Sequence, residues 1–88
     1  MRIEEKIKGG KLVSIEVSDG RVVRITGDFF AHPEELIGLI ENELSKIDPK
    51  IGEENIANAL EKIVKRENGE MIGISPTDLA RIFLKAIE

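Results

Sequence analysis

Strand-like and helix-like segments occupy separate parts of this 88-residue sequence. Three runs near its start alternate apolar with polar side chains, as strands do: 2–8, 11–17 and 21–29. Gly9-Gly10 and Asp19-Gly20 separate these runs as turns. After them the apolar residues follow the period of a helix. This grouping predicts an α+β fold, a three-stranded antiparallel meander with about three helices packed on one face, rather than alternating βαβ units.

The register of the second hairpin follows from which side chains share a face, because a slip of one residue exchanges the two faces of a strand. A two-residue turn at Asp19-Gly20 would place Ile15 and Arg24 on one face. A three-residue loop, Ser18-Asp19-Gly20 with a left-handed glycine, pairs other residues: Val17 with Arg21, Ile15 with Val23, and Val13 with Ile25. We favour this register. Ile3 and Ile7 then join the covered face, and eight residues point outward: Arg2, Glu4, Lys6, Lys8, Ser14, Glu16, Arg24 and Thr26.

Two helices are expected after the meander. The first begins at Pro33, with Glu34 and Glu35 at the positive end of its dipole, and ends before Asp48. The second spans about 53–67 and stops at Asn68-Gly69. Their apolar stripes are Leu36, Ile37, Leu39, Ile40, Leu44 and Ile47, and then Ile56, Ala57, Leu60, Ile63 and Val64.

Ser75 is expected to open a third helix as its N-cap, with Pro76 in the first turn and Asp78 in the place of a capping-box acid. Its core-facing residues are Leu79, Ile82, Phe83, Ala86 and Ile87. Residues 71–74 form a short apolar run that is typical of either a loop or an added strand, and we leave this open.

Length and composition exclude several classes of protein. Eighty-eight residues predict one domain with a small core, and the absence of cysteine removes disulfides, thiolate nucleophiles and the usual structural zinc sites. Thirteen basic against 17 acidic residues give a net charge of −4, which disfavours nucleic acid as a partner. No segment has the length of a membrane span or a secretory signal, so we expect a cytoplasmic protein. A composition rich in Glu, Lys and Ile and lacking Gln is typical of thermophile proteins.

The usual catalytic patterns are absent from the sequence. His32 is the single histidine, so a metal site would need it together with carboxylates such as Asp28 or Glu35; a loop histidine beside a helix start is the alternative. Gly9-Gly10-Lys11 lacks the other residues of a phosphate-binding loop. The acidic residues between 34 and 54 form either a solvated face or a docking surface for a basic partner. We expect no catalytic, cofactor-binding or metal-ligating residue.

The tetrapeptide Gly27-Asp28-Phe29-Phe30 is unusual, because neighbouring side chains on a strand point to opposite faces. In the favoured register Phe29 points inward, and Phe30 points outward with Leu12 and Val22. Three apolar side chains on a polar face would mark a partner surface. Alternatively, the chain turns after Asp28 and buries both rings under the helices.

At these residues the sequence resembles the C-terminal accessory domain of lipoate-protein ligases. The distinctive part is Gly27-Asp28-Phe29-Phe30 after an Asp-Gly hairpin. The rest of the resemblance covers nearly the whole chain: Gly10-Lys11-Leu12, 15–22, Ile25-Thr26, Pro33, 39–44, 56–63 and 72–75. Ser45-Lys46 stands where the family often has glycine, and Ile47 where it often has an aromatic residue, so the exit from the first helix is expected to differ.

In such ligases a larger domain binds lipoate and ATP, forms lipoyl-adenylate, and transfers the lipoyl group to a lysine of an acceptor protein. In some archaea and bacteria the two parts are separate chains, and the small one is needed for adenylation. The resemblance therefore implies that this chain is the non-catalytic small subunit. It also implies that ATP, Mg and lipoate are bound by the catalytic subunit, with no cofactor bound by this chain.

We expect six residues to contact that catalytic subunit: Leu12, Gly27, Asp28, Phe29, Phe30 and Pro33. Gly27 would permit close backbone approach, Asp28 would cap or hydrogen-bond, and Phe30 would be an apolar anchor. Two alternatives stay open. One is a stand-alone interaction scaffold of related fold, which without cysteine has no sulfur-transfer activity. The other is a small enzyme that uses the carboxylates and His32.

Overall fold

The computed structural model describes residues 1–7, 9 and 11–87. Its elements, in chain order, are β1 (Arg2–Lys6), β2 (Leu12–Ser18), β3 (Val22–Gly27), β4 (Phe30–His32), α1 (Leu36–Lys46), the 3₁₀ helix η1 (Pro49–Ile51), α2 (Glu53–Arg66), β5 (Glu70–Ile72) and α3 (Pro76–Ala86). The outward position expected for Lys8 and the turn at Gly10 lie outside the described residues. Within them, no helix has both the length and the apolar character needed to cross a bilayer.

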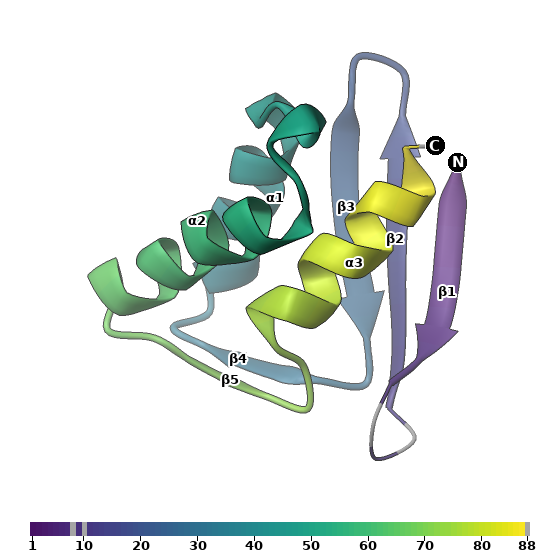
Figure 1. Cartoon of the computed structure of the whole chain (residues 1–88). Coiled ribbons are helices and arrows are strands. Elements are labelled where there is room, and N and C mark those ends of the chain that lie inside the picture. Colours follow the sequence, from purple (N-terminus) through teal and green to yellow (C-terminus); the bar gives the residue numbers. More distant parts are fainter. Residues whose placement is uncertain (8, 10, 88) are drawn as a thin grey trace.

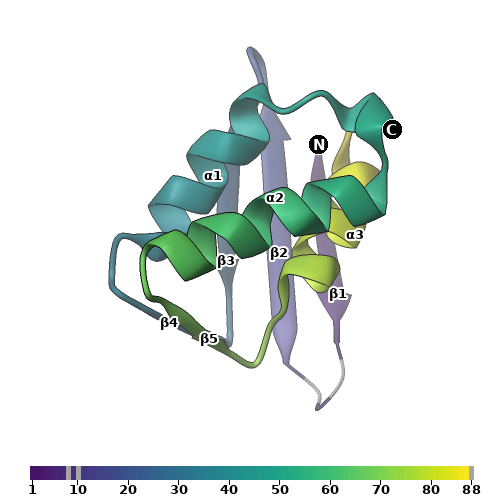
Figure 2. The same ribbon diagram turned by 60° about the vertical axis from the view of Figure 1, so that its left-hand side comes forward.

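The predicted α+β architecture is confirmed. Strands β1, β2 and β3 form an antiparallel sheet in that order, and the helices lie on one side of it (Figure 1). Helix α3 packs on β1 and β2, α1 packs on β3, and α2 packs on both α3 and α1 (Figure 2). The core lies between the sheet and these helices, and its fully buried large side chains include Val13, Ile15, Leu36, Ile40, Leu44, Ile56, Leu60, Leu79, Ile82 and Phe83.

The hairpin between β2 and β3 has the predicted faces but another register. Ile15 pairs with Ile25 and Val17 with Val23, so the pairing is shifted by two residues from the predicted one. The loop is Asp19-Gly20-Arg21 rather than Ser18-Asp19-Gly20. The shift is possible because Arg21, like Gly20, adopts a left-handed backbone, and because the Arg21 guanidinium donates a hydrogen bond to the carbonyl oxygen of Ile47. A shift of two residues preserves the buried and exposed faces.

The outer face of the sheet follows the expected pattern with one exception. Ser14 points away from the helices, as predicted, but it is buried. The Nε group of Arg2 donates a hydrogen bond of 2.9 Å to the Ser14 hydroxyl. The long side chain of Arg2 on the edge strand therefore provides a polar partner for this hydroxyl on the central strand.

Helix α1 begins three residues later than predicted. Residues 33–35 form a turn, in which the Leu36 N–H donates a hydrogen bond of 2.9 Å to the Pro33 carbonyl oxygen. Glu34 and Glu35 consequently lie outside the first helical turn, which contains no acidic residue. The strand β4 extends to His32, so the chain needs these residues to change direction before the helix can start.

The other helix boundaries agree closely with the sequence pattern. Helix α1 ends at Lys46, and α2 spans Glu53–Arg66 with Asn68 in the left-handed region after it. The capping box of α3 is present, because the Ser75 hydroxyl accepts from the Asp78 N–H while the Asp78 carboxylate accepts from the Ser75 N–H. The 3₁₀ helix η1, which was not predicted, joins α1 to α2.

The open segment 71–74 is partly a strand. Residues 70–72 form β5, which pairs antiparallel with β4. These two strands make a separate two-stranded sheet, the ribbon, which runs along the lower side of the molecule in Figure 1. The ribbon places residues 30–32, which follow the meander, beside residues 70–72, which precede α3.

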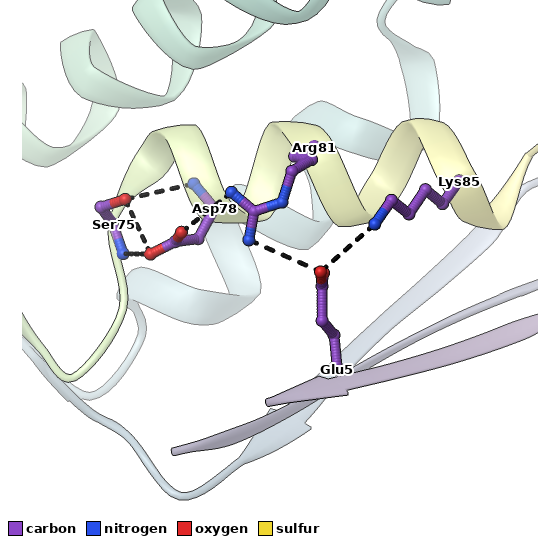
Figure 3. A network of polar contacts seen from close by, with 5 residues as sticks. All are labelled: Glu5, Ser75, Asp78, Arg81 and Lys85. Carbon is purple, nitrogen blue, oxygen red and sulfur yellow. Dashed lines mark hydrogen bonds and ion pairs between the residues drawn. The ribbon is translucent and has the colours of Figure 1, made fainter. Parts of the chain in front are cut away.

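A polar network joins α3 to the edge strand β1 (Figure 3). Glu5 shares the core-facing side of β1 with Ile3, and its carboxylate lies 3.6 Å from Arg81 and 3.2 Å from Lys85. An inward-pointing charge on an edge strand disfavours pairing with another chain. On the opposite edge, Glu41 of α1 accepts a hydrogen bond of 2.8 Å from the Ile25 N–H. Side chains from two helices thus cover polar groups near both edges of the sheet.

Candidate functional site

The distinctive tetrapeptide 27–30 forms the corner between the three-stranded sheet and the ribbon. Gly27 ends β3 opposite Val13, and the Asp28 N–H donates a hydrogen bond of 2.9 Å to the Leu12 carbonyl oxygen. A Cβ atom on Gly27 would lie 2.2 Å from that same oxygen. The close backbone approach expected at Gly27 is therefore made to strand β2 of the same chain.

The two phenylalanines of the corner have different environments. The chain bends at Asp28, directly after β3 ends, and Phe29 is half-buried against the core. Phe30 is 59% exposed and belongs to β4. The structure therefore combines the two predicted alternatives: one ring is covered and the other is exposed. Phe30 does not share the outer face of the meander with Leu12 and Val22, because it lies on the ribbon.

Leu12 and Val22 do not extend an apolar patch around Phe30. Leu12 is half-buried and pairs with Lys6, whereas Val22 is 49% exposed and pairs with Ser18. These two pairs are six residues apart along β2, a separation of about 20 Å at the usual rise of a strand. The predicted three-residue apolar patch on the meander is therefore wrong.

The ribbon carries an exposed apolar pair instead. Phe30 of β4 lies directly opposite Ile72 of β5, and Ile72 is 56% exposed. Side chains opposite each other in an antiparallel pair have Cβ atoms about 5 Å apart, so the two form one continuous apolar surface. Ala31 and Met71, also opposite each other, are partly buried against the core. The ribbon thus has one core-facing side and one exposed side.

Ile72 was not among the predicted site residues. The available signal was the short apolar run 71–74, together with the alternation expected of a strand. A strand there would have placed Met71 and Ile72 on opposite faces. The sequence does not show which distant segment pairs with residues 70–72, so the pairing of Ile72 with Phe30 could not be predicted.

A groove borders the corner and the ribbon. Its volume is about 670 Å³, and it is lined by Ile25, Thr26, Gly27, Phe29, Phe30, Ala31, His32, Glu34 and Ile37. Phe30, which is exposed on the ribbon, is one of its lining residues, and His32 and Glu34 are its ionisable ones. Asp28 is exposed beside it, and Pro33 is half-buried in the turn that leads to α1. Five of the six predicted contact residues thus lie in one continuous segment, 27–33. Leu12 lies next to this segment because its carbonyl oxygen accepts the hydrogen bond from the Asp28 N–H.

The groove and the ribbon carry mainly apolar side chains with a few polar ones. His32 is opposite Glu70 on the ribbon, yet no group of three His, Asp or Glu side chains that could hold a metal is found among residues 1–7, 9 and 11–87. The groove is lined by apolar side chains together with the polar Thr26, His32 and Glu34, a composition that suits protein or small-molecule binding.

Comparison with known protein families, curated proteins and solved structures gives no significant match to this chain. The resemblance to the accessory domain of lipoate-protein ligases therefore rests on the quoted residues. The structure shows that the most distinctive of those residues, 27–30, form the corner that leads into the exposed pair Phe30 and Ile72.

Proposed function

We propose that this chain is the non-catalytic accessory subunit of a two-chain lipoate-protein ligase. In this role it is needed for lipoyl-adenylate formation by a separate catalytic subunit, and acts with that subunit in the cytoplasm. The catalytic subunit binds ATP, Mg and lipoate and modifies the lipoyl-acceptor protein. The observation that carries the proposal is the Gly-Asp-Phe-Phe corner, whose second ring is exposed beside a groove.

An accessory subunit needs no reactive group of its own to raise the rate of adenylation. A small domain that closes over the active site of another chain can exclude water and hold the reactants in line. It then needs an apolar contact surface on a rigid frame. Here the frame is the ribbon, attached through Ala31 and Met71 to the core, and the contact surface includes Phe30.

The second candidate is a stand-alone interaction scaffold. The exposed pair Phe30 and Ile72 supports it equally, because an apolar surface can serve partners that have no connection with lipoylation. The two functions differ in the partner. Purification of the native chain under mild conditions, with identification of the co-eluting protein, separates a lipoyl-adenylating enzyme from any other partner.

The direct test is lipoyl-adenylate formation from lipoate and ATP by the catalytic subunit of the same organism. We expect adenylate only when both chains are present, and none from this chain alone. An unrelated acidic protein of similar size, added at equal concentration, is the control for non-specific effects. The proposal is wrong if the catalytic subunit forms adenylate equally fast without this chain, or if this chain activates lipoate by itself.

A further inference from the structure

We propose that the exposed side of the ribbon, and not the outer face of the meander, is the docking surface of this chain. We further propose that it binds an apolar surface rimmed by lysine and arginine on a different protein. This inference rests on the proposed function, in which that protein is the catalytic subunit, and it assigns the contact to residues from two distant segments.

The apolar part of the docking surface is Phe30 with Ile72. The other large apolar side chains that the structure shows as exposed are Met1, Val22 and Ile51, none of which lies on the ribbon. Only Phe30 and Ile72, among the described residues, are exposed large apolar side chains placed opposite each other on paired strands. Contiguous exposed apolar surface on a small domain marks a binding site more strongly than isolated side chains do.

The ribbon fixes the shape of this apolar pair. Each strand has three residues, and the middle pair, Ala31 opposite Met71, packs on the core. Gly69 allows the entry to β5 to lie close to β4, since a Cβ atom there would be 2.9 Å from the His32 carbonyl oxygen. Phe30 and Ile72 therefore project from a supported surface, which lowers the entropy lost when a partner covers them.

The chain segments that carry the apolar pair are acidic. Segments 28–35 and 69–72 contain no lysine or arginine, and their charged residues are Asp28, Glu34, Glu35 and Glu70, all of them exposed. Glu34 lines the groove beside Phe30, and Glu70 is next but one to Ile72 in β5. The Lys11 side chain lies near Gly73, at one end of this region. The balance stays negative when the end of α2 just before β5 is included, because its exposed basic residues are Lys65 and Arg66, and Arg66 is paired with Glu67.

This charge decides between a second copy of the chain and a different partner. A symmetric dimer through the ribbon would bring the acidic rims of two copies together, and like charges in an interface cost affinity. The chain as a whole also carries a net charge of −4, which opposes self-association. A partner with a basic rim gains from both features, because opposite charges at the rim steer the encounter while the apolar centre provides affinity.

The test measures the affinity of the catalytic subunit for three threonine variants of the full chain: Phe30→Thr, Ile72→Thr and the control Val22→Thr. Threonine is a β-branched residue that favours strands, so the ribbon is retained while its apolar surface is lost. Val22 is the matched control because it is an exposed strand residue at the far end of β3. Thermal unfolding of each variant checks that it is folded.

We expect Phe30→Thr and Ile72→Thr each to weaken binding by at least about tenfold, the loss typical of a central apolar anchor. Val22→Thr should bind as the unmodified chain does. In a second arm, the double variant Glu34→Lys and Glu70→Lys should weaken binding and remove most of its dependence on salt, because the two changes cancel the negative charge of the rim. Glu61→Lys on the exposed side of α2 should change binding little.

The outcomes separate this inference from the proposed function. If the unmodified chain activates the catalytic subunit and both ribbon variants bind it normally, the docking surface lies elsewhere and the inference is overturned while the function stands. If Val22→Thr is the variant that loses binding, the meander face is the interface. If the unmodified chain neither binds nor activates the catalytic subunit, the proposed function fails, and the partner named here fails with it.

Discussion

Replacing Gly27 with alanine tests whether this residue is needed for the fold rather than for contact with a partner. The alanine Cβ would lie 2.2 Å from the Leu12 carbonyl oxygen and 3.0 Å from the Val13 Cα. Both are backbone atoms of the neighbouring strand, so no side-chain rotation relieves the clash. An ordinary contact begins at 3.4 Å, which means that β2 and β3 must separate by more than 1 Å at this point.

The expected cost has two parts. The hydrogen bond from the Asp28 N–H to the Leu12 carbonyl oxygen, 2.9 Å long, would be broken or weakened, at about 0.5–1.5 kcal/mol. Gly27 also has a φ of +153°, which side chains rarely adopt, and such strain costs about 1–3 kcal/mol. We therefore expect Gly27→Ala to lower the free energy of unfolding by about 2–4 kcal/mol, out of about 4–13 kcal/mol for a domain of this size. This corresponds to a fall in Tm of about 10–25 °C.

Urea and thermal unfolding followed by circular dichroism measure this change, and Gly38→Ala is the matched control. Gly38 lies inside α1, is exposed, and has no atom within 4 Å of its Cβ position. Alanine there should raise the free energy of unfolding by about 0.5–1 kcal/mol, because glycine is a poor helix former. The two glycine-to-alanine changes are thus expected to have opposite signs. A Gly27→Ala protein within about 0.5 kcal/mol of the unmodified chain would refute the close-approach argument.

Two further predictions concern α3. Ser75→Ala removes the N-cap hydroxyl that accepts from the Asp78 N–H, and it should lower the free energy of unfolding by about 1 kcal/mol in urea titrations. An unchanged free energy of unfolding would show that this cap does not stabilise the protein. A double-mutant cycle with Glu5→Gln and Lys85→Met should give a coupling energy below about 1 kcal/mol that shrinks as salt is added, because both side chains are partly exposed. A coupling energy that does not change with salt would contradict a solvent-exposed ion pair between them.

Local patterns were sufficient for the faces of the strands and for most helix ends. Alternation predicted that Val13, Ile15 and Ile25 point inward, and all three are buried. The Ser75 and Asp78 capping box is a contact between residues three apart, so its spacing alone identifies it. Such features depend on neighbours in the sequence, and reading them requires no knowledge of the tertiary structure.

Features that depend on distant contacts were predicted less well. The hairpin register differs by two residues because both registers bury the same face, and the observed one includes a contact from Arg21 to Ile47, 26 residues away. The start of α1 was wrong because residues 30–32 pair with β5 instead of leading directly into the helix. Three-residue strands carry too little periodicity to reveal such a pairing.

Loss of binding has different meanings in Gly27→Ala and in the two ribbon variants, Phe30→Thr and Ile72→Thr. Gly27 connects the meander to the ribbon, so the strand separation expected in Gly27→Ala would also displace Phe30, and weaker binding by that variant would not identify a contact residue. Phe30→Thr and Ile72→Thr change exposed side chains on strands whose core-facing pair, Ala31 and Met71, is untouched. Weaker binding at unchanged stability in both, together with weaker binding at reduced stability in Gly27→Ala, would assign the Phe30 ring and Ile72 to recognition and Gly27 to the fold.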